Sequence, residues 1–304
     1  MHKHPKFSQL IAFHEIARYG SIRAAAKVLG QSQPAVTRTL RELEDNLGVA
    51  LVNRSYNGIT LTELGKVFAM RTKFVLEEMQ RAGDELDQLS SHMKGRIAFG
   101  YSSLFAFSIL PNVINEFRRR CPFASVALNE GQLSTLLVPL REGQLDFAIG
   151  TLSPDIPLKD FIEEPLFTTS FRVLARKNHP LSSCTRLADL KDASWIISRS
   201  NMGYYHQLDS LMSPLQGIRI QTDSIVSAFN VMLSGDFLSI MASAMAPPQE
   251  LKNQLCALPI EDSIPDATYY LIYPRKIALT ETARIMIDII RKYSRSFQWE
   301  PVSD

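Results

Sequence analysis

The stretch LGQSQPAVTRTLRELEDNLG, residues 29–48, decides how the N-terminal part of this chain folds. Its apolar residues recur at the spacing of one helix face: Val36, Leu40, Leu43 and Leu47. Ser32 is a suitable N-cap, and Pro34 falls in the first turn, where its missing N–H costs no hydrogen bond. The stretch therefore predicts an amphipathic helix that packs this face inward.

The opposite face of this helix is polar, and its residues are of a particular kind: Gln33, Pro34, Thr37, Arg38 and Arg41. Arginine reaches guanine edges or phosphates, and threonine and glutamine suit base edges or the nucleic-acid backbone. A face that only meets solvent would carry paired charges, but acidic residues appear only toward the C-terminal end of the stretch. The pattern favours contact with DNA over a merely solvated face.

Two shorter helices are expected before this one. The first, within residues 5–20, carries three apolar residues on one face: Leu10, Phe13 and Ala17. It ends at Gly20, and Ser21 is a suitable N-cap for a second helix that closes at Gly30. Three consecutive alanines in the second helix allow a neighbouring helix to approach closely. The succession predicts a helix-turn-helix.

A β-hairpin is expected after the third helix, within VALVNRSYNGITLT, residues 49–62. Asn57-Gly58 is a strong two-residue turn signal between apolar segments. Arg54 lies on this hairpin, where a minor-groove or phosphate contact is natural. The head of the chain is thus predicted to be a winged helix-turn-helix.

The charge distribution supports this interpretation. The chain has 304 residues and a formal net charge of +2, but residues 1–62 hold eight Lys/Arg against four acidic residues. A basic head on a slightly acidic body suggests a polyanionic partner, with chance asymmetry as the alternative. The three cysteines are far apart and form no CxxC pair, which fits a reduced, cytoplasmic compartment. No apolar leader or membrane-spanning stretch is expected.

A long connecting helix is expected from Thr62 to about His92. Its apolar residues fall at Phe68, Val75, Met79, Ala82, Leu86, Leu89 and Met93. From Val75 the steps are four and three in turn, which is a heptad seam with acidic residues around it. The seam favours a dimerisation coil over packing on the chain's own body, and two heads on such a coil would read an inverted repeat.

From Gly95 onward, short apolar strands alternate with helices. RIAFGY, SVALNE and LDFAIGT are predicted strands, with a helix from about Ser103 to Arg120 after the first of them. A similar set follows, and TYYLIYPR offers a strand that could return to the first set before a last amphipathic helix. The sequence alone predicts two α/β units built on parallel sheets.

The stretches SIRAAAKVLGQSQPAVTRTLRELEDNLGVALVNRS and GITLTELG, together with the order of head, long helix and body, resemble the LysR-type transcriptional regulators. The resemblance covers the whole chain. It implies a winged helix-turn-helix in residues 1–62, a linker and dimerisation helix in 63–93 and an effector-binding domain in 94–304. The last domain would resemble type 2 periplasmic binding proteins, with subdomain I at about 95–165 and 270–304 and subdomain II at about 166–269.

The resemblance also implies where DNA is contacted. The DNA-binding positions of the family correspond to Gln33, Pro34, Thr37, Arg38 and Arg54. The polar stripe adds Arg41, and Ser21 at the start of the second helix completes the candidate set.

Ligands of α/β sheets bind at the carboxyl ends of strands and against helix N-termini, and here these positions are rich in hydroxyls. Each of the serines and threonines concerned could instead be an ordinary N-cap, but they recur at the same topological place in both halves. The family's effector pocket falls on these places, and Phe147 or Tyr204 is either an apolar wall of it or plain core. The candidate effector-binding residues are Ser102, Ser103, Gln132, Ser134, Phe147, Thr151, Asn201, Met202, Gly203 and Ser224.

Three short stretches, IGTLS, NMGYY and QLCALPIEDSIPDATYYLI, are similar to family members that control threonine degradation, aminobenzoyl-glutamate use and toluenesulfonate degradation. This similarity implies a small anionic effector of the carboxylate or sulfonate class. The family further implies binding to double-stranded operator DNA as a dimer of dimers, or homotetramer, and contact with RNA polymerase. Whether the protein activates or represses is left open.

Two other classes of function remain as alternatives. One is an architectural DNA-binding protein that ignores ligands, for which the large α/β body is excessive. The other is an enzyme on a binding-protein fold, which would need an acid/base pair or nucleophile that the hydroxyl-rich positions lack. The histidines show no metal-ligand spacing, and no GxSxG, P-loop or GxGxxG motif occurs, so neither a metal nor a cofactor is expected.

Overall fold

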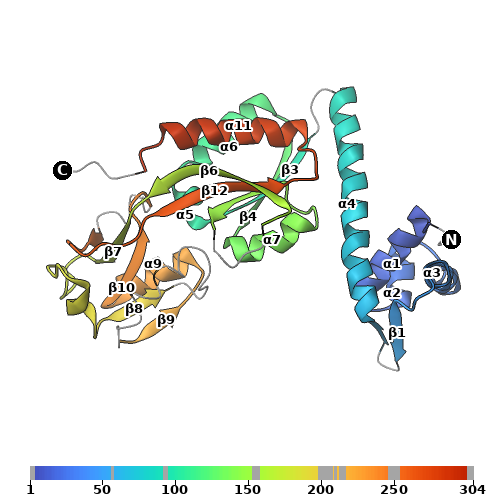
Figure 1. The fold of residues 1–304 in the computed structure, drawn as a ribbon, viewed down its shortest axis with the longest axis horizontal. Coiled ribbons are helices and arrows are strands. Elements are labelled where there is room, and N and C mark those ends of the chain that lie inside the picture. Colours follow the sequence, from blue (N-terminus) through green and yellow to red (C-terminus); the bar gives the residue numbers. More distant parts are fainter. Residues whose placement is uncertain are drawn as a thin grey trace. The chain divides into compact units, whose positions relative to one another are not determined.

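The computed structural model describes residues 4–55, 58–91, 95–152, 158–197, 208, 211, 217–245 and 254–299 (Figure 1). The chain forms two compact units, and the main boundary between them lies within the long helix, after Leu86. The first unit holds the head, and the second holds two five-stranded sheets.

The head contains three helices in the order that the sequence predicts: α1 (Phe7–Tyr19), α2 (Ile22–Val28) and α3 (Gln33–Leu47). The Ser21 and Ser32 hydroxyls accept hydrogen bonds from backbone amides in the first turns of α2 and α3, as expected of N-caps. α1 and α3 each end at a glycine in the left-handed region, Gly20 at φ 60° and Gly48 at φ 70°.

The core of the head lies between these helices. Val36, Leu40 and Leu43 of α3 are buried, and Leu47 is half-buried at the edge. The predicted face of α1 is only partly right: Phe13 is buried, but Leu10 and Ala17 are half-buried, and the inward face is completed by Gln9, Ala12 and Ile16. Gln9 is a polar residue in this face because its Oε1 accepts a hydrogen bond from the Lys6 amide at 2.9 Å and so caps the helix.

The wing is a two-stranded antiparallel hairpin of β1 (Val52–Ser55) and β2 (Gly58–Leu61). Glu44 of α3 fixes its base, because one carboxylate oxygen accepts hydrogen bonds from the amides of Leu51 and Val52 at 2.7 and 3.2 Å. Asn57, the other half of the predicted turn, lies outside the described residues.

The long helix α4 (Glu63–Ser91) begins at Thr62, whose hydroxyl caps the Gly65 amide at 2.9 Å and donates to the Ala50 carbonyl at 2.9 Å. Phe68 lies against Phe13, with ring centroids 5.4 Å apart, so it belongs to the core of the head rather than to the predicted seam. Leu64, Val67, Val75, Met79 and Leu86 are exposed apolar residues along the same helix.

In the second unit, the first sheet has the strand order β4-β3-β5-β12-β6. Its strands are β3 (Arg96–Tyr101), β4 (Ser125–Glu130), β5 (Phe147–Thr151), β6 (Phe161–Thr169) and β12 (Ala267–Pro274). β3 is parallel to β4 and β5, whereas β12 is antiparallel to β5 and β6. The returning strand that the sequence suggested is therefore confirmed, but the sheet is mixed rather than parallel.

The second sheet has the order β11-β7-β10-β8-β9. Its strands are β7 (Phe171–Arg176), β8 (Ser194–Ile197), β9 (Arg219–Gln221), β10 (Phe237–Ala242) and β11 (Leu255–Ala257). The chain leaves the first sheet between β6 and β7 and re-enters it between β11 and β12, so two α/β subdomains are joined by two crossings. Subdomain I thus extends to Thr169 and resumes at Ala267, compared with about 165 and 270 expected from the sequence.

Helices cover both faces of the first sheet. α6 (Leu110–Arg120) and α11 (Glu281–Ser296) lie side by side over one face (Figure 1), where Phe117 and Ile290 pack against Phe99 in one cluster. α7 (Leu133–Arg141) packs Leu136 and Leu140 on the other face. In subdomain II, α9 (Ile225–Ser234) packs Phe229 and Met232 on its sheet, and η1 (Leu187–Leu190) is a short 3-10 turn.

The helical stretch expected for residues 103–120 is present, but it is divided. Two helices, α5 (Ser103–Phe107) and α6, are separated at Ser108, whose backbone leaves the helical region and whose hydroxyl donates to the Leu104 carbonyl at 2.7 Å. Pro111 then occupies the first turn of α6, where it needs no N–H partner. The break lets α5 end early and α6 start in a new direction.

Candidate functional site

The N-terminal half of α3 is a polar surface on a rigid base. Gln33, Pro34, Arg38 and Arg41 are exposed and Thr37 is half-buried, while the opposite face of the helix is in the core. The Arg38 side chain is 82% exposed and lies 3.6 Å from Glu42, which is itself 52% exposed. Because an exposed pair of this kind contributes little, it leaves the guanidinium available for another partner.

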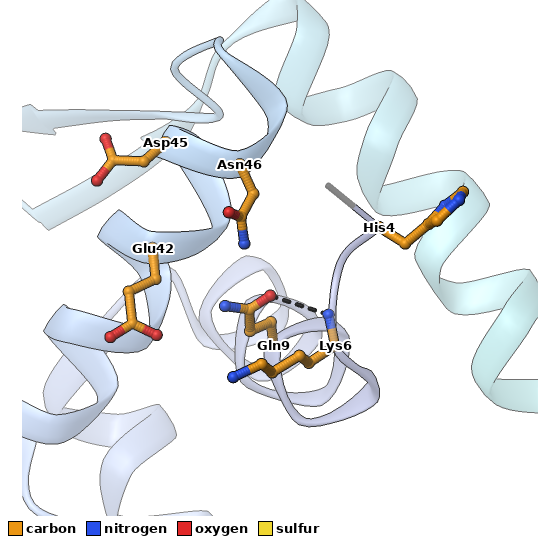
Figure 2. Close-up of a pocket in the computed structure, with 6 residues that line it drawn as sticks. All are labelled: His4, Lys6, Gln9, Glu42, Asp45 and Asn46. Carbon is orange, nitrogen blue, oxygen red and sulfur yellow. Dashed lines mark hydrogen bonds between the residues drawn. The ribbon is translucent and has the colours of Figure 1, made fainter. Parts of the chain in front are cut away.

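The C-terminal half of α3 has the opposite charge. Glu42, Asp45 and Asn46 line a cavity of about 360 Å³ together with His4, Lys6 and Gln9 from the start of the chain and α1 (Figure 2). The close-up shows the Gln9 side chain hydrogen-bonded to the Lys6 amide, which fixes this end of α1. The two arginines of α3, Arg38 and Arg41, therefore come before its acidic residues Glu42, Glu44 and Asp45.

Two further DNA candidates lie beside this surface. The Ser21 hydroxyl accepts a hydrogen bond from the Ala24 amide at 3.3 Å and so acts as a cap. Arg54 pairs with Ile59 in the wing hairpin, and its side chain lies outside the part that the structure describes. The Ile59 amide donates to the Gly20 carbonyl at 3.1 Å, so the wing is attached to the end of α1.

The second unit contains a cavity of about 660 Å³ between its two subdomains. Its lining residues are Ser103, Glu130, Gly131, Gln132, Ser134, Thr135, Asp223, Ser224, Ile225 and Val226. Four of them, Ser103, Gln132, Ser134 and Ser224, are among the candidates that the sequence predicts. They come from the ends of β3 and β4 in subdomain I and the start of α9 in subdomain II, which the fold brings together.

The remaining candidates lie elsewhere. Phe147 is not a wall of this cavity, because it is fully buried and stacks on Phe99 with centroids 4.9 Å apart; the core alternative is correct for it. Ser102 and Thr151 are half-buried at the ends of their strands but do not line the cavity. Asn201, Met202 and Gly203, with Tyr204, lie outside the described residues.

Two carboxylates in the lining, Glu130 and Asp223, were missed by the sequence reasoning. Glu130 is the last residue of an edge strand and Asp223 precedes an N-cap, and both positions are common for ordinary solvated acids. The order Glu-Gly-Gln-Leu-Ser, residues 130–134, could have indicated Glu130. When a strand is followed directly by a helix, the last side chain of the strand lies at the same edge of the sheet as the helix N-terminus.

The hydroxyls on the subdomain I wall have defined hydrogen-bond directions. The Ser103 hydroxyl donates to Glu130 Oε1 at 2.6 Å, and the Thr135 hydroxyl donates to the Gln132 carbonyl at 2.8 Å. Both protons are thus engaged within the protein, and what these two hydroxyls can offer a ligand is lone pairs.

The Glu130 carboxylate also acts on the neighbouring Tyr101. Burial, and secondarily the Glu130 carboxylate, raise the pKa of Tyr101 at the end of β3. An anion within about 4 Å of such a carboxylate is repelled by about 1 kcal/mol in bulk water and about 4 kcal/mol at an effective dielectric constant of 20. The wall formed by Ser103 and Glu130 therefore disfavours a second negative charge.

Two helix N-termini supply donors to the same cavity. α7 starts at Leu133 and α9 at Ile225, and residues of both first turns line the cavity. The Ser224 hydroxyl accepts from the Ser227 amide at 3.2 Å, which leaves its own proton to donate. Backbone N–H groups and the helix dipole favour an anionic group at such ends.

The cysteines take no part in either surface. Cys121, Cys184 and Cys256 are all half-buried with free thiols. Burial raises the pKa of Cys121 and of Cys256, so the reactive thiolate is disfavoured at both. Thiols of this kind are typical of packing residues, and they give no support to a role of these cysteines in sensing oxidants.

Family comparisons identify the class of both units. Residues 7–66 match the model of the bacterial regulatory helix-turn-helix proteins of the LysR family, and residues 90–295 match the LysR substrate-binding domain. The chain belongs to the LysR family and is a DNA-binding transcriptional regulator with an effector-binding domain, not an enzyme.

Individual relatives agree with this assignment. The chain is 37% identical over 296 residues to the transcriptional regulator TdcA of Escherichia coli K12, covering 95% of this chain and 94% of TdcA. It is 34% identical over 178 residues to PcaQ of Agrobacterium fabrum, covering 59% of this chain and 57% of PcaQ.

Solved structures of full-length regulators share the fold. Full-length OxyR from Pseudomonas aeruginosa matches with a TM-score of 0.71 at 20% identity, covering 99% of this chain and all of that one. CbnR in complex with its target DNA matches with a TM-score of 0.68 at 19% identity, covering 95% and 99%. Within the described residues, none of the helices combines the length and hydrophobicity needed to cross a membrane.

Proposed function

We propose that this regulator reads an operator with the N-terminal half of α3 in the major groove and the wing on the flanking backbone. The observation that carries this proposal is the polar stripe of exposed Gln33, Arg38 and Arg41 and half-buried Thr37, on a helix whose other face packs in the core. Ser21, Pro34 and Arg54 complete the contact surface. CbnR, a solved structure of the same fold, is complexed with its target DNA, and this supports DNA as the partner.

The experiment that tests this proposal uses the full-length protein and a fragment of its own promoter region. Replacing Arg38 by Ala weakens specific binding by about 1–3 kcal/mol if the guanidinium reads a base. If it holds a phosphate, all sequences weaken alike and the salt slope falls by about one. Arg119→Ala, at an exposed position in the last turn of α6, is the matched control. A variant Arg38→Ala that binds as tightly as this control contradicts the proposal.

Each proposed domain has one role: residues 1–62 bind DNA, residues 63–93 pair two chains, and residues 94–304 bind the effector. Support for pairing comes from α4, where Val75, Met79 and Leu86 are 41%, 56% and 67% exposed at heptad spacing. A two-fold pair of heads matches an inverted repeat. Two such pairs form the proposed dimer of dimers, which contacts RNA polymerase at the promoter.

The effector is a small polar metabolite bound in the 660 Å³ cavity between the subdomains. A carboxylate or sulfonate group of this ligand binds at the N-termini of α7 and α9, with Ser134, Ser224 and Gln132 as side-chain donors. A ligand that touches both subdomains favours their closed arrangement. The ligand can shift the equilibrium toward this arrangement only by as much as its affinity for the closed state exceeds its affinity for the open state. The placement of the heads changes with that equilibrium.

An architectural protein that ignores ligands makes a different prediction from this one. Its affinity for DNA would be unchanged across a panel of metabolites, and substitution of Ser134 by Ala would have no effect on regulation. Loss of the response to effector in Ser134→Ala, with DNA binding intact, supports the sensor.

A further inference from the structure

We propose that the effector carries an ammonium group as well as a carboxylate, which makes it a small amino acid, and that Glu130 binds the ammonium. This inference rests on the proposed function, because it names the ligand class of the same cavity. It follows from the cavity lining, in which two carboxylates, Glu130 and Asp223, lie together with the N-termini of α7 and α9.

The wall around Glu130 is built from acceptors. Glu130 contributes a carboxylate, and Ser103 contributes a hydroxyl whose proton is already directed at that carboxylate, 2.6 Å away. The Thr135 hydroxyl, with its proton on the Gln132 carbonyl at 2.8 Å, likewise offers lone pairs. A group that satisfies several acceptors at once must bring several protons, and an ammonium has three.

The described lining adds a second carboxylate and contains no lysine, arginine or histidine. Asp223 lines the cavity from subdomain II, just before the N-cap of α9. A ligand with only negative charge would therefore be attracted by helix N-termini and repelled by a carboxylate in the same cavity. A ligand with both charges matches both features.

The charges also explain how such a ligand acts on the fold. Glu130 and Ser103 belong to subdomain I, and the start of α9 belongs to subdomain II. An amino acid with its ammonium on Glu130 and its carboxylate at α9 connects the two subdomains. Removing either charge from the ligand removes one of the two attachments.

The experiment compares ligands in matched sets of three on the full-length protein. Each set contains an amino acid, the hydroxy acid that replaces its amine by a hydroxyl, and the amine that lacks its carboxylate. Suitable sets are L-alanine with lactate and ethylamine, L-serine with glycerate and ethanolamine, and L-phenylalanine with phenyllactate and phenethylamine. Binding is measured by isothermal titration calorimetry and by the shift in melting temperature.

The expected result is that at least one amino acid binds tenfold or more tightly than both of its partners. Glu130→Gln keeps an acceptor for the Ser103 hydroxyl. It should weaken the binding of that amino acid at least tenfold and leave the binding of the hydroxy acid unchanged or make it tighter. Glu281→Gln, an exposed carboxylate on α11 outside the cavity, should change neither.

The inference is overturned if a hydroxy acid binds as well as its amino acid, if Glu130→Gln has no effect, or if no member of any set binds. DNA binding by the same preparations separates this failure from that of the proposed function. If binding to the promoter fragment is intact, the proposed function as a regulator still holds and only the assignment of an amino acid as effector fails. Loss of DNA binding in the wild type contradicts the proposed function itself.

Discussion

Helix α3, proposed to read DNA, and helix α9, at the proposed effector cavity, both start with a serine cap. The side chains around the two helix starts differ in charge. Each is capped by a serine, Ser32 or Ser224, that accepts a hydrogen bond from an amide in the first turn. The first turns of α3 lead into exposed arginines, whereas α9 starts in a cavity lined by two carboxylates. A helix N-terminus alone thus does not define a ligand, since the side chains around it decide which anion, or which end of a zwitterion, is accepted.

The two regions also differ in how tightly their surroundings are fixed. The head is held by close backbone packing, as at Gly65, where an added Cβ would lie 1.9 Å from the Leu51 carbonyl oxygen. The effector cavity lies between two subdomains, and in the described residues the chain passes between their sheets at two places. We therefore expect substitutions in the core of the head to act through folding and those in the cavity to act through ligand affinity.

The largest effect is predicted for Gly65→Ala. The new methyl group would meet backbone that cannot move without displacing the wing, so the head should lose about 3 kcal/mol or more of unfolding free energy. Thermal denaturation followed by circular dichroism measures the loss. Gly83→Ala, in the same helix with open space around the new Cβ, should instead stabilise by about 0.5–1 kcal/mol. Equal stability of the two variants would show that the close contact is absent.

A smaller effect is expected for Met79→Lys on the exposed stripe of α4. A charge in a heptad seam must be buried on pairing, so the dissociation constant of the dimer should rise about 100-fold, or about 3 kcal/mol. Gln80→Lys adds the same charge one position further along the helix, away from the seam. Sedimentation of both variants at several concentrations distinguishes them, and an unchanged dimer in Met79→Lys would assign the stripe to another role.

The pH dependence of the effector domain should show the contribution of Glu116. A hydrogen bond from Lys292, with further ones from Tyr293 and Arg120, holds the pKa of Glu116 at about 2, below its ordinary value of 4.5. Because the folded pKa is the lower one, the stabilisation is complete above pH 4.5 and is lost as the pH falls toward 2.

Glu116→Gln should therefore flatten the fall of unfolding free energy between pH 4.5 and 2, measured by urea denaturation at a series of pH values. Glu281→Gln, whose carboxylate lies 3.8 Å from Arg284 on the surface, should keep the wild-type profile. Identical profiles for the wild type and Glu116→Gln would remove Glu116 from the acid response.

The smallest effect on stability is predicted for Ser102→Ala. This change removes a buried hydroxyl without a partner in the described residues, so the unfolding free energy should stay the same or rise by up to about 1 kcal/mol. A clear loss of stability would show that Ser102 has a structural partner.

The head could be predicted from the sequence almost residue by residue because its signals are local. Ser21, Ser32 and Gly20 each act within one turn of chain, and the structure places them at the helix ends where local rules put them. The prediction of the inward face of α1 was less accurate. Gln9 is buried because it caps the helix, and a polar residue is not expected to be buried from the sequence pattern.

The effector domain was predicted less completely because its features depend on distant pairing. β6 was missed since it is an edge strand with charged residues and Pro165, which falls at an irregularity in the register with β12. The cavity acids were missed for the same reason: Glu130 and Asp223 are 93 positions apart, and only the two crossings bring them to one cavity.

The most direct test of the central claim is whether the purified full-length protein retards a fragment of its own promoter region at low ionic strength. Circular dichroism and a cooperative melting transition first establish that the head is folded. We predict a discrete retarded complex that Arg38→Ala weakens and Arg119→Ala leaves unchanged. A folded protein that retards no such fragment would contradict the assignment of α3 as the DNA-reading helix.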